Sequence, residues 1–227
     1  MAPPVVLVHG WGGSFDSTWV ANGFTELLRD AGRTVVGVDL LGHGTAPKPH
    51  DPNAYDDLTT RVLEAVPDEP FDAVGFSLGA ITLLRLAMNH AERFGRLVVA
   101  GVGASLFETD DARTRRIVAA LEGHGDPDDN LARMFVRYAH QNGNDVVALT
   151  AVMKRSRFHI DPSMLSAVTC PTLVILGDRD FAGPAEPLVD ALPDATLRTL
   201  KNVDHFATPD AYGFIDATLE FLDAVPS

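Results

Sequence analysis

Short apolar runs alternate with helical patterns along most of this chain, and this alternation is the feature that most restricts its fold. The runs are rich in valine, isoleucine and leucine, and they are almost continuously hydrophobic. Such runs are typical of strands that are buried on both faces of a parallel sheet. We expect six strands, at Val5 to Val8, Thr34 to Asp39, Phe71 to Phe76, Arg96 to Ala100, Thr172 to Leu176 and Ala195 to Leu200.

The segments between these runs have the apolar spacing of helices. Leu83, Leu84, Leu86 and Ala87, for example, form a stripe at helical spacing. Alternation of strands and helices predicts βαβ units, and therefore an α/β fold with a doubly wound, mostly parallel sheet of about six strands. We expect helices at Ser17 to Ala31, Asn53 to Val66, Leu78 to Glu92, Pro184 to Leu192 and about Pro209 to Ala224.

The alternation breaks once, between residues 103 and 165, where no strand pattern appears. Three helical stretches, Thr109 to Leu121, Asp129 to His140 and Asp145 to Lys154, predict a short helical cap inserted into a core made of residues 1–102 and 166–227. The insertion is nearly neutral, because it holds eight of the 18 Lys and Arg residues and nine of the 31 acidic ones. We expect its basic residues on solvated helix faces, unless one or two arginines face the cleft and receive an acidic substrate. These residues are Arg113, Arg115, Arg116, Arg133, Arg137, Lys154, Arg155 and Arg157.

Composition excludes several classes of function. The net charge of −13 disfavours binding to nucleic acid or to an anionic membrane surface. Cys170 is the single cysteine, so no internal disulfide is possible. No apolar run has the length of a membrane span, and no signal peptide is visible at the amino end. We expect a cytoplasmic protein, and the sequence leaves its oligomeric state open.

The strongest motif is Gly75-Phe76-Ser77-Leu78-Gly79, which follows an expected strand and precedes an expected helix. This context is the one that a G-x-S-x-G nucleophile elbow requires. The turn is so tight that side chains at the two glycine positions would collide with neighbouring backbone. The amide groups at the start of the helix point toward the serine, where negative charge develops during nucleophilic attack.

A second glycine-rich segment, His9-Gly10-Trp11-Gly12-Gly13-Ser14, directly follows the first expected strand. Glycines at this place let a backbone amide approach a ligand closely. The spacing is not G-x-G-x-x-G, and no Lys-Ser/Thr pair follows, so a nucleotide-binding loop is disfavoured. We expect His9 to anchor the loop by hydrogen bonds rather than to transfer protons.

Two further segments place acidic and imidazole groups late in the chain. Asp178 and Asp180 both follow the strand at Thr172 to Leu176, and spacing alone does not separate them as partners for a histidine. His205 follows the last strand and precedes the last helix, which completes the order Ser, Asp, His. A neutral imidazole accepts the serine proton and returns it to a leaving group. No H-E-x-x-H motif or Cys/His cluster indicates a metal site, and no cofactor is expected.

Together these motifs resemble the α/β-hydrolase superfamily, specifically its small serine esterase branch, over nearly the whole chain except the insertion. His9-Gly10-Trp11-Gly12 is similar to the oxyanion loop of that branch, and Asp39-Leu40-Leu41-Gly42-His43-Gly44 to a D-x-x-G-x-G segment in which the histidine is structural. Gly177-Asp178-Arg179-Asp180 followed by Pro184 resembles G-x-x-D-x-x-x-P. The resemblance implies a triad of Ser77, Asp180 and His205, with the amides of Trp11 and Leu78 as oxyanion donors.

Two departures from the family pattern stand out. Only four residues precede Val5, so we expect the family's N-terminal hairpin to be missing. The cap is short, which leaves the choice of substrate open. Ser77 at the nucleophile position, in place of aspartate, argues against haloalkane dehalogenase and epoxide hydrolase activity.

The resemblance implies a serine hydrolase that cleaves carboxylic esters of small or medium apolar substrates through an acyl-enzyme intermediate. Carbon–carbon bond hydrolysis or cofactor-free perhydrolysis by the same triad is the first alternative, and a small-molecule receptor without turnover is the second. The pocket is expected to be lined by Trp11, Phe76, Leu106, Phe107, Phe135 and Phe206.

Overall fold

The computed structural model describes residues 2–66, 68–108, 112–141, 143–156 and 158–226. Within these residues, six strands form one sheet in the order β2-β1-β3-β4-β5-β6, and every neighbouring pair is parallel. This confirms the expected doubly wound α/β fold. The strands are β1 (Val5–Val8), β2 (Val35–Val38), β3 (Phe71–Phe76), β4 (Phe94–Ala100), β5 (Thr172–Gly177) and β6 (Ala195–Leu200).

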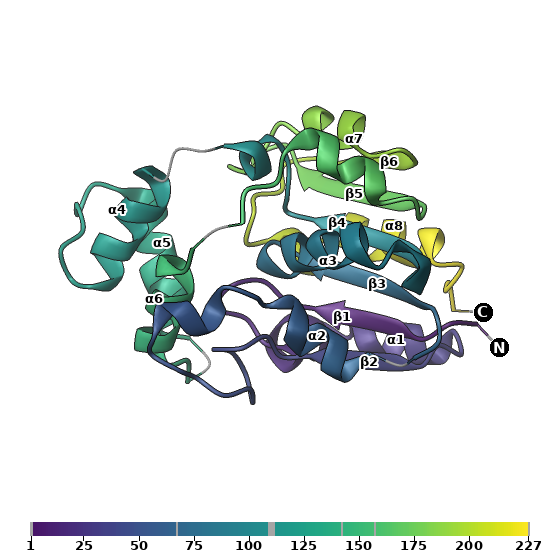
Figure 1. Cartoon of the computed structure of the whole chain (residues 1–227), viewed down its shortest axis with the longest axis horizontal. Coiled ribbons are helices and arrows are strands. Elements are labelled where there is room, and N and C mark those ends of the chain that lie inside the picture. Colours follow the sequence, from purple (N-terminus) through teal and green to yellow (C-terminus); the bar gives the residue numbers. More distant parts are fainter. Residues whose placement is uncertain (1, 67, 109–111, 142, 157, 227) are drawn as a thin grey trace.

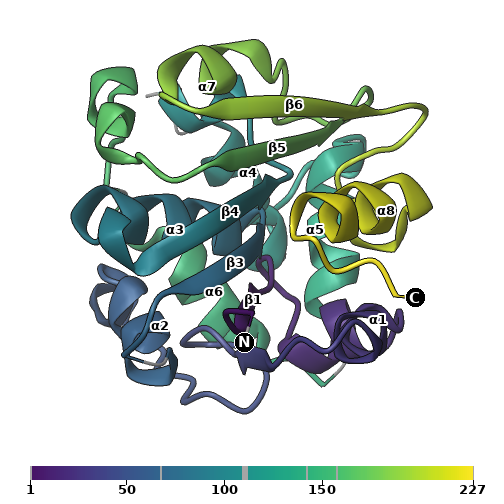
Figure 2. The same cartoon turned by 90° about the vertical axis from the view of Figure 1, so that its right-hand side faces the viewer.

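Helices cover both faces of this sheet, because successive side chains of each central strand are apolar and point to opposite faces. In β1, Val6 and Val8 belong to one hydrophobic cluster, and Val5 and Leu7 belong to the other. Figure 2 shows α2 and α3 on one side of the sheet and α1 and α8 on the other. The α-helices that flank the sheet are α1 (Phe24–Asp30), α2 (Thr59–Ala65), α3 (Leu78–Asn89), α7 (Glu186–Ala191) and α8 (Tyr212–Phe221).

Most of these helices are shorter than the apolar spacing predicts. The expected helix at Ser17 to Ala31 is divided by Gly23, whose φ of 79° is left-handed, so that a short helix precedes α1. The expected helix at Asn53 to Val66 likewise divides into two. The short 3₁₀ or π segments that take up the remaining residues are η1 (Asp16–Val20), η2 (Pro52–Tyr55), η3 (Ala91–Arg93) and η6 (Thr208–Asp210).

The segment between β4 and β5 lies beyond the sheet. It contains α4 (Ala112–Leu121), α5 (Asn130–Ala139) and α6 (Val146–Lys154), flanked by η4 (Ala104–Phe107) and η5 (Pro162–Ala167). Figure 1 shows α4 to α6 at the end of the molecule where the strands terminate, opposite the two chain termini. Residues 109–111, the expected start of the first of these helices, lie outside the described residues, as does Arg157. No helix among the described residues is long and apolar enough to cross a membrane.

The order of the strands fixes where a site forms. The connection from β1 leads to β2 on one side of β1, and the chain then returns past β1 to β3 on the other side. The loops that leave β1 and β3 therefore diverge, and they open a crevice at the carboxyl ends of these two strands. Ligands of open α/β sheets bind in such a crevice.

Candidate active site

Ser77 lies in the turn between β3 and α3, with a φ of 50°. A positive φ strains the backbone of a residue that carries a side chain. The turn requires glycine on both sides, because a Cβ atom at Gly75 would lie 2.6 Å from Cα of Ala80, and one at Gly79 would lie 2.3 Å from the carbonyl oxygen of Val8. This geometry holds the serine at the carboxyl edge of the sheet.

Ser77, His205 and Asp180 form a chain of hydrogen bonds. Nε2 of His205 lies 3.0 Å from Oγ of Ser77, and Nδ1 of His205 lies 2.9 Å from both carboxylate oxygens of Asp180. The side chain of Asp180 is fully buried, and that of His205 is 6% exposed. A carboxylate at Nδ1 favours the tautomer that carries a proton there, which leaves Nε2 free to accept the proton of the serine hydroxyl.

Asp178, the other carboxylate that the sequence left open, does not reach the histidine. Its Oδ1 accepts a hydrogen bond of 2.8 Å from the backbone amide of Asn202. Asp180 is held in place by a different bond, because its Oδ1 also accepts 2.8 Å from the amide of Ala182. The two aspartates thus accept hydrogen bonds from different loops, and only Asp180 contacts the imidazole.

Aromatic rings hold the imidazole of His205 from several directions. The ring centroid of Phe181 lies 4.3 Å from that of His205, that of Phe76 lies 5.0 Å away, and Phe206 makes an edge contact at 5.6 Å. Phe181, which directly follows Asp180, was missed in the sequence analysis. Its position next to the candidate acid is the signal that would have found it.

Two backbone amides lie in the loops beside Ser77. Leu78 is the first residue of α3, and Trp11 is in the loop after β1. Among the described residues, neither amide donates a hydrogen bond to another backbone or side-chain acceptor. The expectation that these two amides act as oxyanion donors stays a prediction, and Leu78 lies at the positive end of the α3 dipole.

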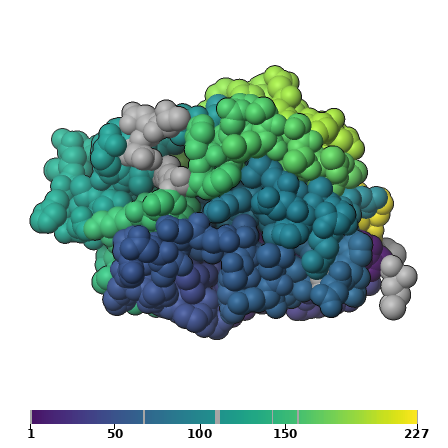
Figure 3. Space-filling view, in the orientation of Figure 1, coloured from purple at the N-terminus to yellow at the C-terminus, as the bar shows by residue number. Residues whose placement is uncertain are grey.

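A cavity of about 350 Å³ opens beside Ser77 and His205. Its wall comes from the loop after β1, from η2, α2 and α3, from α4 to α6 and from the segment that follows α6. Figure 3 shows the blue chain of η2 and α2 and the green chain that follows α6 next to one another on the same face of the molecule. The apolar lining residues are Trp11, Tyr55, Leu58, Leu78, Ile81, Val102, Leu106, Ile117, Phe135, Met153, Phe158, Ile160, Phe181 and Ala182.

Comparison with known proteins places the chain in a family. The family described as alpha/beta hydrolase fold matches residues 3–123, slightly more than half of the chain. The chain belongs to the α/β-hydrolase family. The matched part includes Ser77, whereas Asp180 and His205 lie beyond it.

Individual relatives of this α/β-hydrolase have different activities. A 2-hydroxy-6-oxononadienedioate/2-hydroxy-6-oxononatrienedioate hydrolase of Cupriavidus pinatubonensis is 27% identical over 91% of this chain and 81% of its own length. A pimeloyl-[acyl-carrier protein] methyl ester esterase of Methylococcus capsulatus is 44% identical, but over 37% of this chain and 31% of its own. A solved serine hydrolase involved in carbazole degradation superposes with a TM-score of 0.71 at 27% identity, covering 98% of this chain and 91% of the other.

The six apolar pocket residues predicted for the hydrolase divide into two groups. Trp11, Leu106 and Phe135 line the cavity. Phe76, Phe107 and Phe206 are not part of its lining: Phe76 is 5% exposed and packs under His205, and the other two pack against the core. They fill the structure around the site because the strand and loops that carry them turn these rings inward. The missed lining residues Ile81, Arg85 and Met153 lie on helices, where lining a cavity cannot be told from packing in the core by sequence spacing.

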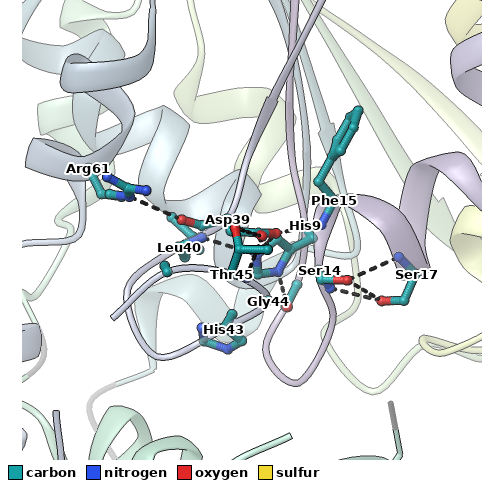
Figure 4. Close-up of polar contacts among 12 residues, drawn as sticks. His9, Ser14, Phe15, Ser17, Asp39, Leu40, His43, Gly44, Thr45 and Arg61 are labelled. Carbon is teal, nitrogen blue, oxygen red and sulfur yellow. Dashed lines mark hydrogen bonds and ion pairs between the residues drawn. The ribbon is translucent and has the colours of Figure 1, made fainter. Parts of the chain in front are cut away.

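A polar network fixes the loop after β1 in the hydrolase, as Figure 4 shows. The carboxylate of Asp39 accepts hydrogen bonds from the backbone amides of Phe15 at 2.8 Å and Thr45 at 2.7 Å. Nε2 of His9 accepts 3.1 Å from the amide of Leu40, and Nδ1 of His9 lies 2.7 Å from the carbonyl oxygen of Gly10. His9 thus connects the loops after β1 and β2, as expected for a loop anchor.

Burial keeps two imidazoles beneath this loop neutral. The rings of His9 and His43 lie 5.0 Å apart, and both residues are fully buried. Burial lowers the pKa of His9, and burial together with repulsion from the protonated form of His9 lowers the pKa of His43 to about 3. For Asp39, burial opposes ionisation, but the hydrogen bonds from Thr45 and Phe15 outweigh it and lower the pKa of the carboxyl group. The loop therefore rests on neutral histidines and an ionised aspartate.

The described residues contain no group of three or more His, Cys, Asp or Glu side chains arranged to hold a metal ion. Cys170 is buried, and burial raises the pKa of its thiol. It lies outside the cavity lining.

Proposed function

We propose that this protein is a carboxylic ester hydrolase in which Ser77, His205 and Asp180 act as a catalytic triad. The observation that carries the proposal is the chain of hydrogen bonds from Ser77 Oγ through both nitrogens of His205 to Asp180. Its position beside a cavity whose wall includes apolar residues such as Leu58, Ile81 and Phe135 supports a substrate with an apolar acyl or alcohol group.

The geometry supports the following sequence of steps. Ser77 Oγ attacks the ester carbonyl carbon while Nε2 of His205 takes the hydroxyl proton, and the imidazolium that forms is stabilised by Asp180. The carbonyl oxygen becomes negatively charged and accepts hydrogen bonds from the amides of Trp11 and Leu78. The tetrahedral intermediate then collapses, His205 gives its proton to the departing alcohol, and an acyl-enzyme remains.

Water completes the reaction at the same groups. His205 takes a proton from a water molecule that attacks the acyl carbon, and it returns that proton to Ser77 as the acid leaves. We propose that α4 to α6 act as the cap helices of the site and cover the cavity from above. Trp11, Leu106 and Phe135 then contact the bound substrate.

The proposal is tested with p-nitrophenyl acetate and butyrate and with a fluorophosphonate probe. We expect hydrolysis by the wild type, loss of activity in Ser77→Ala by a factor of about 10⁴ or more, and labelling at Ser77 alone. Equal rates for the wild type and Ser77→Ala would refute the proposal. Turnover by neither protein, without labelling, would favour a binding protein on a hydrolase scaffold.

Carbon–carbon bond hydrolysis of a diketone acid is a second candidate, because two arginines of the cap region line the cavity. Arg113 and Arg155 are both lining residues, and the guanidinium carbon of Arg113 lies 5.4 Å from the ring centroid of Phe181, which contacts His205. Such a cation near the triad suits a substrate carboxylate. Cleavage of a 2-hydroxy-6-oxo dienoate faster than that of p-nitrophenyl butyrate would favour this candidate over ester hydrolysis.

A further inference from the structure

One face of α3 has the proposed nucleophile at its amino end and an arginine two turns further along. Ser77, Ile81 and Arg85 are four residues apart, so they lie on the same side of the helix. All three line the cavity and are half-buried, whereas Leu83 and Leu84 of the same helix are buried in the core. Eight residues at 1.5 Å per residue separate Ser77 from Arg85 by about 12 Å along the helix axis.

Apolar residues form part of the cavity wall, together with the hydroxyl groups of Thr59 and Thr82. Ile81 lies at the middle of the helix face, and Leu58, Met153 and Ile160 from other elements line the same cavity. An alkyl chain extended along this face would be removed from water for much of its length. The cavity thus has a reactive hydroxyl at one end, apolar residues in its wall and a guanidinium at the other end.

The guanidinium of Arg85 is held in place by two contacts. Nη1 donates a hydrogen bond of 2.9 Å to the carbonyl oxygen of Asp56, and the guanidinium carbon lies 4.6 Å from the ring centroid of Phe158. A guanidinium has five N–H donors, so most remain available to a ligand. These contacts orient Arg85 at the cavity wall without neutralising it.

The positive charge of Arg85 is not paired with a carboxylate of a described residue. Among the described residues, no carboxylate lies within 4 Å of the Arg85 guanidinium. Glu108, the acidic lining residue, pairs with Arg113 at 3.4 Å. The charge of Arg85 contributes to the lowered pKa of Asp57. The Oδ1 atom of Asp57, however, accepts hydrogen bonds from the amide and hydroxyl of Thr59 at 2.9 and 2.7 Å.

The cavity therefore has the opposite charge to the rest of the chain. Its charged lining residues are Arg85, Arg113, Arg155 and Glu108, and His159 also contributes to the wall. The chain as a whole carries −13. A cluster of this sign in an acidic protein selects an anionic ligand over a cationic one.

We infer that Arg85 binds the terminal carboxylate of an acyl chain whose ester carbonyl lies at Ser77, so that the preferred substrates are half-esters of α,ω-dicarboxylic acids. The inference rests on the proposed ester hydrolysis. His205 protonates the leaving oxygen, so the alcohol lies on its side of Ser77, and the α3 face is left to the acyl chain. A planar carboxylate suits the bidentate donors of a guanidinium.

The test uses mono-p-nitrophenyl esters of glutaric, suberic and sebacic acid, each compared with the p-nitrophenyl ester of the monocarboxylic acid of equal carbon number. We expect the wild type to prefer the half-ester at one of the two longer lengths and not at the shortest. In Arg85→Gln the ratio of the two kcat/KM values at that length should fall about tenfold, mainly through KM of the half-ester. Arg85→Lys should retain part of the preference, because it keeps the positive charge but lacks the paired N–H donors of a guanidinium.

Arg29→Gln is the matched control, because Arg29 is an exposed arginine on α1, paired with Glu26 at 2.5 Å and outside the cavity lining. It should keep the wild-type ratio at every length. Two results would overturn the role of Arg85 and leave ester hydrolysis in place. One is wild-type hydrolysis without a preference for any half-ester, and the other is an equal fall of both rates in Arg85→Gln. Equal hydrolysis by the wild type and Ser77→Ala would instead overturn the proposed function itself.

Discussion

The indole nitrogen of Trp11 donates a hydrogen bond of 3.0 Å to the carbonyl oxygen of Leu149 in α6. A second bond ties the same parts together, because Nδ2 of Asn144 donates 2.7 Å to the carbonyl oxygen of Gly12. The loop that carries one proposed oxyanion donor is therefore fastened to the helices above the cavity. We expect a shift of α6 to move the Trp11 amide and thereby to affect the proposed chemistry.

This coupling predicts the effect of Trp11→Phe, which removes the indole donor and keeps an aromatic ring. We expect kcat for p-nitrophenyl butyrate to fall roughly tenfold, less than the complete loss of an oxyanion donor costs. The free energy of unfolding should fall by about 1 kcal/mol, the typical net contribution of one hydrogen bond. Steady-state kinetics and urea unfolding measure the two effects.

Trp19→Phe is the control for this substitution. Trp19 is fully buried between Phe24 and Phe214, and its indole nitrogen has no hydrogen-bond partner among the described residues. We expect Trp19→Phe to lower stability through lost packing but to leave kcat within about twofold of the wild type. The coupling is refuted if Trp11→Phe keeps wild-type kcat, or if both variants lose kcat equally.

The two aspartates after β5 give a second matched pair. Asp180→Asn removes the charge at Nδ1 of His205 and favours the wrong tautomer, so kcat should fall by roughly 10³ to 10⁴. Asp178→Asn keeps an oxygen that accepts the bond from the amide of Asn202, so kcat should stay within about twofold. Both are measured with p-nitrophenyl butyrate, and a larger loss in Asp178→Asn would reverse the assignment of the acid.

The strands were predictable because their sequence signal is local. Four or more consecutive apolar residues such as Val5 to Val8 satisfy a strand with two buried faces, and few other structures. The break at Gly23 was less visible, because the apolar spacing continues on both sides of it while the backbone turns left-handed. Hydrophobic spacing reports which side of an element is buried, and it does not report where the backbone turns.

The reactive groups could be predicted from local sequence signals, whereas the lining residues could not. Ser77 and His205 occupy places in the order of strands and helices that few other residues share, so chain order indicated them. Phe76 and Phe135 are both aromatic and buried, yet Phe76 packs under the imidazole and Phe135 faces the cavity. Which way each ring points depends on the packing of distant elements, and that information is not local in the sequence.

The buried ion pair between Arg33 and Asp72 is another feature that has no local signal. Their side chains are each 3% exposed and bonded to one another, and Arg33 also donates to the carbonyl oxygens of Leu222 at 2.7 Å and Pro3 at 2.7 Å. We expect Asp72→Asn to lower the free energy of unfolding by about 3 kcal/mol, because it leaves a buried charge without its partner. Activity should persist under native conditions, because Asp72 lies near the amino end of β3 and Ser77 follows its carboxyl end.

The exposed pair of Arg29 and Glu26 provides the comparison for this prediction. Its side chains are 48% and 63% exposed, so water screens the interaction. Glu26→Gln should change the free energy of unfolding by less than about 1 kcal/mol. Urea unfolding of both variants measures the difference, and equal losses would contradict a special contribution of the buried pair.

The neutral histidines beneath the loop after β1 set the pH dependence of stability. The pKa of His43 is about 3 in the folded protein, because burial and repulsion from the protonated form of His9 disfavour protonation, and it is about 6.5 in an unfolded chain. Between these values the unfolded state binds more protons than the folded state, so the free energy of unfolding falls as the pH falls. The stability is fully present above about pH 6.5 and is lost toward pH 3, and burial of His9 acts in the same direction. The ionised carboxylate of Asp39 also stabilises the folded state, because its folded pKa lies below its ordinary value of 3.8, but this contribution is lost only below about pH 3.8 and so does not change between pH 7.5 and pH 5.

We therefore expect the free energy of unfolding to fall between pH 7.5 and pH 5, by up to about 1.4 kcal/mol per pH unit for each of the two histidines. His43→Gln should flatten this dependence, even if it lowers stability at pH 7.5, because it removes one of the two groups that protonate on unfolding. His124→Gln, which changes an exposed histidine, should keep the wild-type slope. Urea unfolding of the three proteins at pH 7.5, 6.0 and 5.0 measures the slopes. If the wild type and His43→Gln lose stability in parallel, then His43 is protonated to the same extent in both states, and its burial does not control the acid sensitivity of the fold.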